Sequence, residues 1–131
     1  MGAPTGTPTA RLSLRVDLAN GAAVGPGKVR LLELVRDTGS IAEAARAMGM
    51  SYRRAWLLVD EVNRSLESPA VAGSAGGRRG GGARLTPAGE RLVALYRAVE
   101  AAAAAAAGPE LDALDGMAAA GFRAGAPEDI G

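Results

Sequence analysis

Apolar and polar residues alternate strictly near the start of the chain. Every second residue from Leu12 to Leu18 is apolar, and the residues between them are polar. This period of two predicts a β-strand with one buried face. Asn20-Gly21 follows, a pair that is favoured in tight hairpin turns because it tolerates positive φ. We therefore expect a hairpin whose short return strand covers residues 22–24.

A helical pattern replaces the alternation beyond this hairpin. Gly25-Pro26 opens the first predicted helix, since proline suits the first helical position. Gly39 would end that helix in a left-handed conformation. Ser40 and Glu43 then have the spacing of a capping box, in which each side chain accepts from the other residue's backbone N–H. The second helix that they start has an apolar face at helical spacing, formed by Ile41, Ala44, Ala45 and Met48.

A third helix is predicted directly after Gly49, which breaks the second one. Ser51 caps its start, the helix runs to about Leu66, and Ser68-Pro69 stops it. Two short helices joined by a glycine-containing turn are typical of a helix-turn-helix, although an ordinary helical hairpin has the same pattern. The inner face of the third helix is expected to hold Tyr52, Ala55, Leu58 or Val59, Val62 and Leu66.

The segment from Pro69 to Thr86 predicts a second hairpin. Val71 and Leu85 would lie in its two strands, and residues 73–82 between them include six glycines. Thr86-Pro87 then starts a fourth helix that continues through an alanine run to Gly108. One apolar face of this helix would hold Leu92, Leu95, Tyr96 and Val99, and a weak amphipathic helix would follow around Leu111, Leu114 and Met117.

The order of these elements is that of a winged helix-turn-helix, a mainly α fold with small β-hairpins. We expect the domain to cover residues 11–107, after a flexible arm at 1–10 and before a C-terminal tail at 108–131. The fourth helix would be ~30 Å long. This length favours a strut in a homodimer, although a helix packed on its own domain is the alternative.

Composition narrows the class of function. The chain has 131 residues, with no cysteine and no histidine. It therefore lacks thiolate ligands, disulfides and the commonest general base. The carboxylates have no paired spacing with a nucleophile, so we expect no enzyme, no cofactor and no metal site. No apolar run approaches the ~20 residues of a membrane span, and no secretory signal is visible, so we expect a cytoplasmic protein with no membrane partner.

Charge is distributed unevenly along the chain, although the net charge is only +1. Residues 28–97 hold twelve basic and seven acidic side chains, whereas residues 98–131 hold one basic and six acidic ones. A basic middle segment suits a polyanionic partner.

The start of the third helix carries the most specific charge signal. Arg53 and Arg54 lie in its first turn, where the helix dipole disfavours cations. The N-terminal end of a recognition helix, however, faces bases and phosphates of double-stranded DNA. We therefore predict that residues 51–66 enter the major groove by their N-terminal end, with Ser51 and Tyr52 beside the arginines. Solvated arginines at a helix start are the alternative.

The rest of this region adds two predictions. The far half of the third helix is acidic, at Asp60, Glu61 and Glu67, and should tilt away from phosphate. The glycine-rich segment 73–82 is predicted to be a wing that lays Arg78, Arg79 and the nearby Arg84 on the DNA backbone or in the minor groove, the alternative being a solvated loop. Trp56, the single tryptophan, is predicted to belong to the core rather than to stack on bases.

Three stretches together resemble the N-terminal domain of the ModE family of molybdate-dependent transcriptional regulators, related to the LysR-type winged helices. They are residues 25–32, residues 39–56 and residues 83–89, and the run Met50-Ser-Tyr-Arg-Arg-Ala-Trp is the most specific part. The resemblance implies a homodimer that binds operator DNA near molybdenum-transport genes. Candidate DNA contacts are Ser40, Ser51, Tyr52, Arg53, Arg54, Arg78, Arg79 and Arg84.

The chain departs from the family at its C-terminal end. Full-length members carry C-terminal molybdate-binding domains, for which residues 108–131 are too few. We therefore expect no molybdate binding within this chain. A winged helix that binds a protein partner, and a DNA-binding protein indifferent to sequence, are the competing hypotheses.

Overall fold

The computed structural model describes residues 9–74 and 82–125. These ranges form a mainly α fold with two antiparallel hairpins, so the predicted winged helix-turn-helix is confirmed. The elements in chain order are β1 (Val16–Asp17), β2 (Ala23–Val24), α1 (Pro26–Thr38), α2 (Ile41–Met48), α3 (Tyr52–Ser65), β3 (Val71–Ser74), β4 (Gly82–Leu85), α4 (Pro87–Ala106) and α5 (Gly108–Gly116).

The first strand is shorter than its alternating pattern predicts. Only Val16 and Asp17 pair with β2, and in the same register Leu14 would face Pro26. Proline has no N–H to donate and already starts α1, so the pairing cannot extend. The alternation itself is confirmed in burial, because the apolar residues from Leu12 to Leu18 are half-buried and those between them are exposed. The predicted turn is also confirmed, with Gly21 at a φ of 90°.

The predicted ends of α1 and α2 are confirmed, but the capping box is only half formed. Gly39 ends α1 with a φ of 76°, and Ser40 Oγ accepts a 3.1 Å hydrogen bond from the Glu43 N–H. The reciprocal bond is absent because both of its groups have other partners. The Ser40 N–H donates to Thr38 Oγ1, and the Glu43 carboxylate pairs with Arg46 at 2.6 Å.

The hydrophobic core is built around α1, which packs on α2, α3, α4 and β4. Its four largest fully buried side chains all belong to this helix: Val29, Leu31, Leu32 and Val35. Aromatic side chains are few in the sequence, so branched aliphatic residues and alanine fill the remaining space. Burial of one such aliphatic side chain stabilises the fold by ~1.5–3 kcal/mol.

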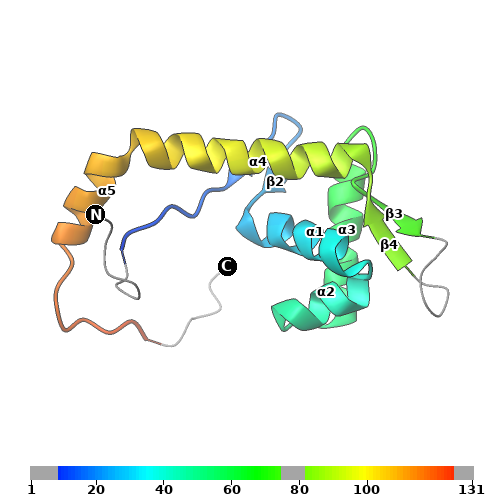
Figure 1. Cartoon of the computed structure of the whole chain (residues 1–131), viewed down its shortest axis with the longest axis horizontal. Coiled ribbons are helices and arrows are strands. Elements are labelled where there is room, and N and C mark those ends of the chain that lie inside the picture. Colours follow the sequence, from blue (N-terminus) through cyan, green and yellow to red (C-terminus); the bar gives the residue numbers. More distant parts are fainter. Residues whose placement is uncertain (1–8, 75–81, 126–131) are drawn as a thin grey trace.

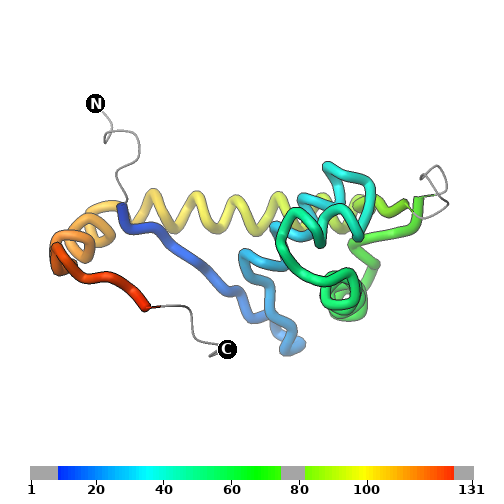
Figure 2. Tube along the Cα trace, turned by 90° about the horizontal axis from the view of Figure 1, so that it is seen from below, coloured from blue at the N-terminus to red at the C-terminus, as the bar shows by residue number. Residues whose placement is uncertain are grey.

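α4 runs along the long axis of the molecule, with other elements beyond both of its ends (Figure 1). The helix-turn-helix and the second hairpin lie at one of its ends and α5 at the other, as the second view also shows (Figure 2). The N-terminal segment returns beside α4 from α5 towards β1. Two hydrogen bonds hold it there, from the Tyr96 hydroxyl to the Leu14 carbonyl at 2.7 Å and from the Ala10 N–H to Asp115 Oδ2 at 3.2 Å.

The packed side of α4 matches the predicted apolar face only in part: Tyr96 and Leu92 pack on the core as predicted, but Leu95 and Val99 do not. Gly89, Val93 and Tyr96 face the core, whereas Leu95 and Val99 are 51% and 46% exposed. Gly89 explains the rotation, because a Cβ built on it would lie 2.2 Å from the Ala70 carbonyl oxygen. Only this residue lets the start of α4 approach the segment before β3 so closely, and the side that carries it therefore turns inward.

An ion pair fixes α4 to α1 farther along. Arg97 Nη2 and Nε donate to the two oxygens of Glu33 at 2.8 and 3.0 Å. These hydrogen bonds lower the pKa of the Glu33 carboxyl. A fork of this kind fixes geometry as well as charge.

The predicted helix around Leu111 and Leu114 is confirmed as α5, but none of its side chains is buried. Within the described residues, no helix combines the length and the apolar content that crossing a membrane requires.

Candidate nucleic-acid interface

The turn between α2 and α3 sets the position of the predicted recognition helix. Gly49 ends α2 with a φ of 71°, a left-handed conformation that suits glycine. The Met50 N–H then donates to the Ala45 carbonyl at 3.0 Å, which closes the turn tightly. Ala45 itself is buried, so a larger side chain there would push the two helices apart.

The first turn of α3 presents four consecutive candidate residues to solvent. Ser51 caps the helix, with its Oγ accepting from the Arg54 N–H at 3.1 Å. Ser51, Tyr52, Arg53 and Arg54 are all exposed, so the structure brings together the predicted contacts of this helix. Tyr52 was also expected on the inner face, and this prediction is wrong, because its side chain is 55% exposed.

Most basic side chains of the described residues are held in ion pairs, but the arginines at the start of α3 are not. Carboxylates lie within ion-pair distance of Arg15, Lys28, Arg30, Arg36, Arg46, Arg64 and Arg97. Across residues 9–74 and 82–125, by contrast, no carboxylate pairs with Arg53, Arg54 or Arg84, nor with Arg11, Arg91 and Arg123, which lie outside the helix-turn-helix and the second hairpin. The guanidinium groups of Arg53, Arg54 and Arg84 keep their donors free for an anionic partner.

Two carboxylates in the far half of α3 are paired, one with α1 and one within the helix, whereas Glu67 lies beyond the helix and has no ion pair among the described residues. Glu61 pairs with Lys28 at 2.9 Å, and this contact lowers the pKa of the Glu61 carboxyl. Asp60 pairs with Arg64 at 2.9 Å. The helix therefore carries free positive charge at its first turn and paired charge farther along.

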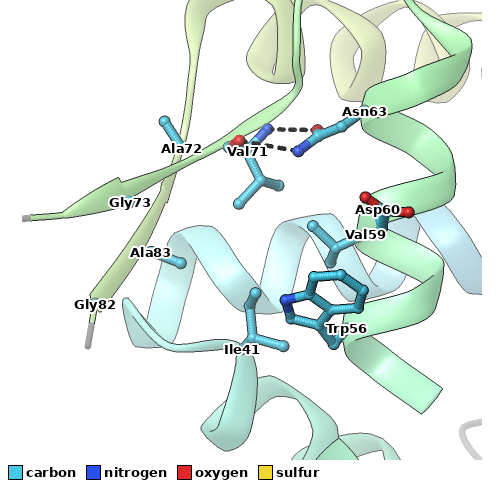
Figure 3. Close-up of a pocket in the computed structure, with 10 residues that line it drawn as sticks. All are labelled: Ile41, Trp56, Val59, Asp60, Asn63, Val71, Ala72, Gly73, Gly82 and Ala83. Atoms are coloured by element: carbon cyan, nitrogen blue, oxygen red, sulfur yellow. Dashed lines mark hydrogen bonds between the residues drawn. The ribbon is translucent and has the colours of Figure 1, made fainter. Parts of the chain in front are cut away.

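The second hairpin is confirmed, with Val71 and Leu85 in its two strands, and the structure places these two residues opposite each other. Asn63 fastens it to α3 through three hydrogen bonds. The Asn63 Oδ1 accepts from the N–H groups of Ala70 and Val71 at 2.8 and 3.0 Å, and its Nδ2 donates to the Val71 carbonyl at 3.1 Å (Figure 3). Strand β4 is tied to the helices as well, because the Ala83 N–H donates to the Gly39 carbonyl at 2.9 Å.

These bonds bring two further candidates to one edge of the helix-turn-helix. Arg84 follows Ala83 and is exposed. Ser40 follows Gly39 and is half-buried, and its Oγ already accepts from the Glu43 N–H as the cap of α2. The predicted wing contacts Arg78 and Arg79 lie outside the described residues.

Trp56 does not belong to the core as predicted, since its side chain is 45% exposed. It projects from α3 towards Ile41 and the hairpin, across a crevice of about 180 Å³ (Figure 3). The hairpin side of this crevice is lined by Ala72, Gly73 and Gly82, which are too small to cover an indole ring. The prediction failed because it considered spacing along α3 and not the size of the residues that face it.

Sequence reasoning also missed Asn63. A polar residue four positions after the buried Val59 lies beside the inner face of α3, and this position could have indicated a partner in the hairpin. As for metals, the described residues contain no group of three or more carboxylates that could hold an ion.

Comparison with known proteins identifies the type of domain that this region forms. Residues 27–90 match the model of the bacterial regulatory helix-turn-helix proteins of the lysR family. The chain is 50% identical over 84 residues to the molybdenum-pterin-binding protein MopB of Rhodobacter capsulatus, an alignment that covers 64% of this chain and 31% of the relative.

Two further relatives bear the name ModE. Identity is 45% over 91 residues with the molybdenum transport protein ModE of Azotobacter vinelandii, covering 70% of this chain and 33% of that protein. It is 37% over 87 residues with the DNA-binding transcriptional dual regulator ModE of Escherichia coli K12, covering 66% and 33%. The chain thus spans about a third of the length of the curated relatives that it matches. Residues 27–90 therefore form a helix-turn-helix domain of the lysR family, and through this region the chain is a relative of the ModE proteins.

Proposed function

We propose that the chain is a sequence-specific DNA-binding transcriptional regulator, with residues 11–107 as its DNA-binding unit. One observation carries the proposal: Arg53 and Arg54 are exposed and without an ion pair among the described residues, at a helix start where the dipole disfavours cations. Contacts of these arginines with a DNA phosphate or a guanine edge would outweigh that unfavourable interaction. The lysR-type domain and a relative named as a transcriptional regulator support this function.

In this proposal α3 enters the major groove by its first turn. As the helix cap, Ser51 Oγ already accepts from the Arg54 N–H, but its hydroxyl hydrogen is free to donate to a phosphate. Tyr52 lies beside it. The hairpin would follow the neighbouring backbone, with Arg84 at its base and Arg78 and Arg79 in the wing. Ser40 would contribute a contact from the start of α2.

A homodimer is the second part of the proposal. Leu95 and Val99 leave apolar surface on α4, and the alanine run beyond them allows another helix to approach closely. A second copy packed against this face would place two recognition helices on one duplex, one helical turn of ~34–36 Å or a multiple of it apart.

The test is fluorescence anisotropy with labelled duplexes from upstream of this gene and of neighbouring transport genes, beside a scrambled duplex. A specific site should bind ~10³-fold or more tightly than the scrambled duplex, and its affinity should fall steeply with salt. Arg53→Ala combined with Arg54→Ala should weaken binding by ~10²-fold and reduce the salt slope by about two. Arg15→Ala is the control, because this arginine is also exposed but pairs with Asp17 in the first hairpin, outside the helix-turn-helix.

Two other results would support the competing hypotheses. Equal, salt-sensitive affinity for both duplexes indicates a DNA-binding protein that is indifferent to sequence. Failure to bind any duplex at low salt contradicts the proposal and favours a winged helix that binds a protein. Molybdate added to the same titration should leave the affinity unchanged if, as we propose, this chain holds no molybdate site.

A further inference from the structure

The crevice between α3 and the hairpin leaves an aromatic side chain partly exposed to solvent. Trp56 is 45% exposed, although a tryptophan in a small domain normally buries most of its ring. Its indole Nε1–H has no hydrogen-bond acceptor in the described part of the chain. Figure 3 shows the ring lying at the crevice with this nitrogen on the side away from α3.

The other polar groups of the crevice already have partners. The Asn63 amide is bound to the backbone of Ala70 and Val71, and the Asp60 carboxylate is paired with Arg64. The remaining lining is apolar or glycine. The crevice therefore offers one flat apolar surface and one free N–H donor. Its volume of about 180 Å³ is below the ~300–1,000 Å³ of sites for drug-sized ligands, which argues against a small-molecule effector.

DNA geometry supplies an occupant with this chemistry. The major and minor grooves of a duplex are separated by one sugar–phosphate strand. When α3 lies in the major groove and the hairpin follows the next groove, that strand has to pass between them. The crevice lies at this place, bounded by the second turn of α3 on one side and by the base of the hairpin on the other.

We propose that this crevice holds one sugar–phosphate unit of the bound DNA, with the Trp56 ring packed on the deoxyribose and its Nε1–H donating to the phosphate. The inference rests on the proposed function, since it requires that the helix-turn-helix binds a duplex. The Asp60 carboxylate repels the phosphate, so the phosphate would lie at the indole nitrogen, on the side of the crevice away from α3, and only the uncharged sugar would lie towards Asp60.

Trp56 is the only tryptophan in the chain, so emission excited at wavelengths that the two tyrosines do not absorb reports on this site alone. The first experiment titrates the wild-type protein with unlabelled specific duplex and measures quenching of its emission by acrylamide. Protection from acrylamide is expected, with the Stern–Volmer constant falling at least twofold and saturating at the same DNA concentration as the anisotropy of a labelled duplex. A Stern–Volmer constant that does not change while anisotropy shows full binding overturns the inference and leaves the proposed function intact.

The second experiment uses two variants of the same residue. Trp56→Ala should weaken specific binding roughly 10-fold, because both the packing and the donor are lost. Trp56→Phe keeps an aromatic face without the N–H, so its affinity should lie between those of the wild type and Trp56→Ala. The salt slope should stay at its wild-type value in both variants, because a neutral indole releases no counterion. The salt slope therefore distinguishes loss of the Trp56 contact from loss of the arginine contacts, which should lower it.

Leu114→Ala on α5 is the control, since this exposed apolar side chain lies far from the helix-turn-helix. Circular dichroism verifies that each variant is folded. Wild-type affinity in folded Trp56→Ala overturns the inference, and a wild-type protein that binds no duplex overturns both this inference and the proposed function.

Discussion

Gly89 gives the sharpest test of how the second hairpin is attached to the domain. A Cβ at this position would lie 2.2 Å from the Ala70 carbonyl oxygen and 3.0 Å from its carbon. Both atoms are backbone, so Gly89→Ala cannot be relieved by rotating a side chain. Either the start of α4 or the segment before β3 has to move. The same carbonyl oxygen accepts from the Thr86 N–H at 2.9 Å, and this hydrogen bond would be stretched by the movement.

The magnitude follows from three contributions. Inserting a methyl group into a tightly packed site costs ~1–3 kcal/mol. A weakened Thr86–Ala70 hydrogen bond adds ~0.5–1.5 kcal/mol. Replacing glycine by alanine in a helix returns at most ~1 kcal/mol. We therefore expect Gly89→Ala to lower the free energy of unfolding by about 1–3 kcal/mol, a sizeable part of the ~5–15 kcal/mol typical of a domain.

Urea unfolding followed by circular dichroism measures this change, with Gly27→Ala as the matched control. Gly27 also lies in the first turn of a helix, but no atom lies within 4 Å of a Cβ built there. Gly27→Ala should leave stability unchanged or raise it by up to ~1 kcal/mol. The reasoning is refuted if Gly89→Ala is as stable as Gly27→Ala at an equal denaturant slope.

Three further predictions concern other contacts. Asn63→Ala should cost ~1–3 kcal/mol, because it leaves the buried N–H of Ala70 without its partner; hydrogen exchange at that amide should accelerate, and unchanged protection would contradict the prediction. The pKa of Glu33 is lowered in the fold, so its stabilising effect is complete above the ordinary value of 4.5 and is lost as pH falls below it; the urea midpoint should therefore drop more between pH 7 and pH 3 in wild type than in Glu33→Gln, and equal drops would contradict the prediction. Leu95→Glu should convert the proposed dimer into a monomer without unfolding it, as light scattering after gel filtration would report, whereas an unaltered dimer mass would place the interface elsewhere.

Local signals allowed much of this fold to be predicted from the sequence. Helix ends depend on the residues at the ends themselves, so Ser51, Gly39 and Gly49 indicated the caps that the structure contains. The two strands of the second hairpin were located by Val71 and Leu85, since both strands bury an apolar side chain against the same core.

Predictions about which side of a helix packs on the core were wrong in part, although the helices themselves were predicted. Periodicity along α4 identified apolar residues, but the close approach at Gly89 decides which of them pack, and that contact joins parts of the chain from different elements. Likewise, Trp56 is exposed because small residues lie opposite it across the crevice, which no pattern within α3 could reveal. In both cases the deciding atoms belong to another element.

The alanine run from Ala101 to Ala107 sets both the distance of α5 from the rest of the domain and the angle of α5 around the axis of α4. Its side chains contribute little packing, so this half of the helix depends on the intrinsic preference of alanine for helical backbone. Each residue added or removed there would shift α5 by ~1.5 Å and rotate it by about 100° around the helix axis. A single deletion would therefore carry Asp115 to another side of α4 and break its bond to Ala10. Insertions of three or four residues nearly restore the original angle, and are the changes of length that this architecture can absorb.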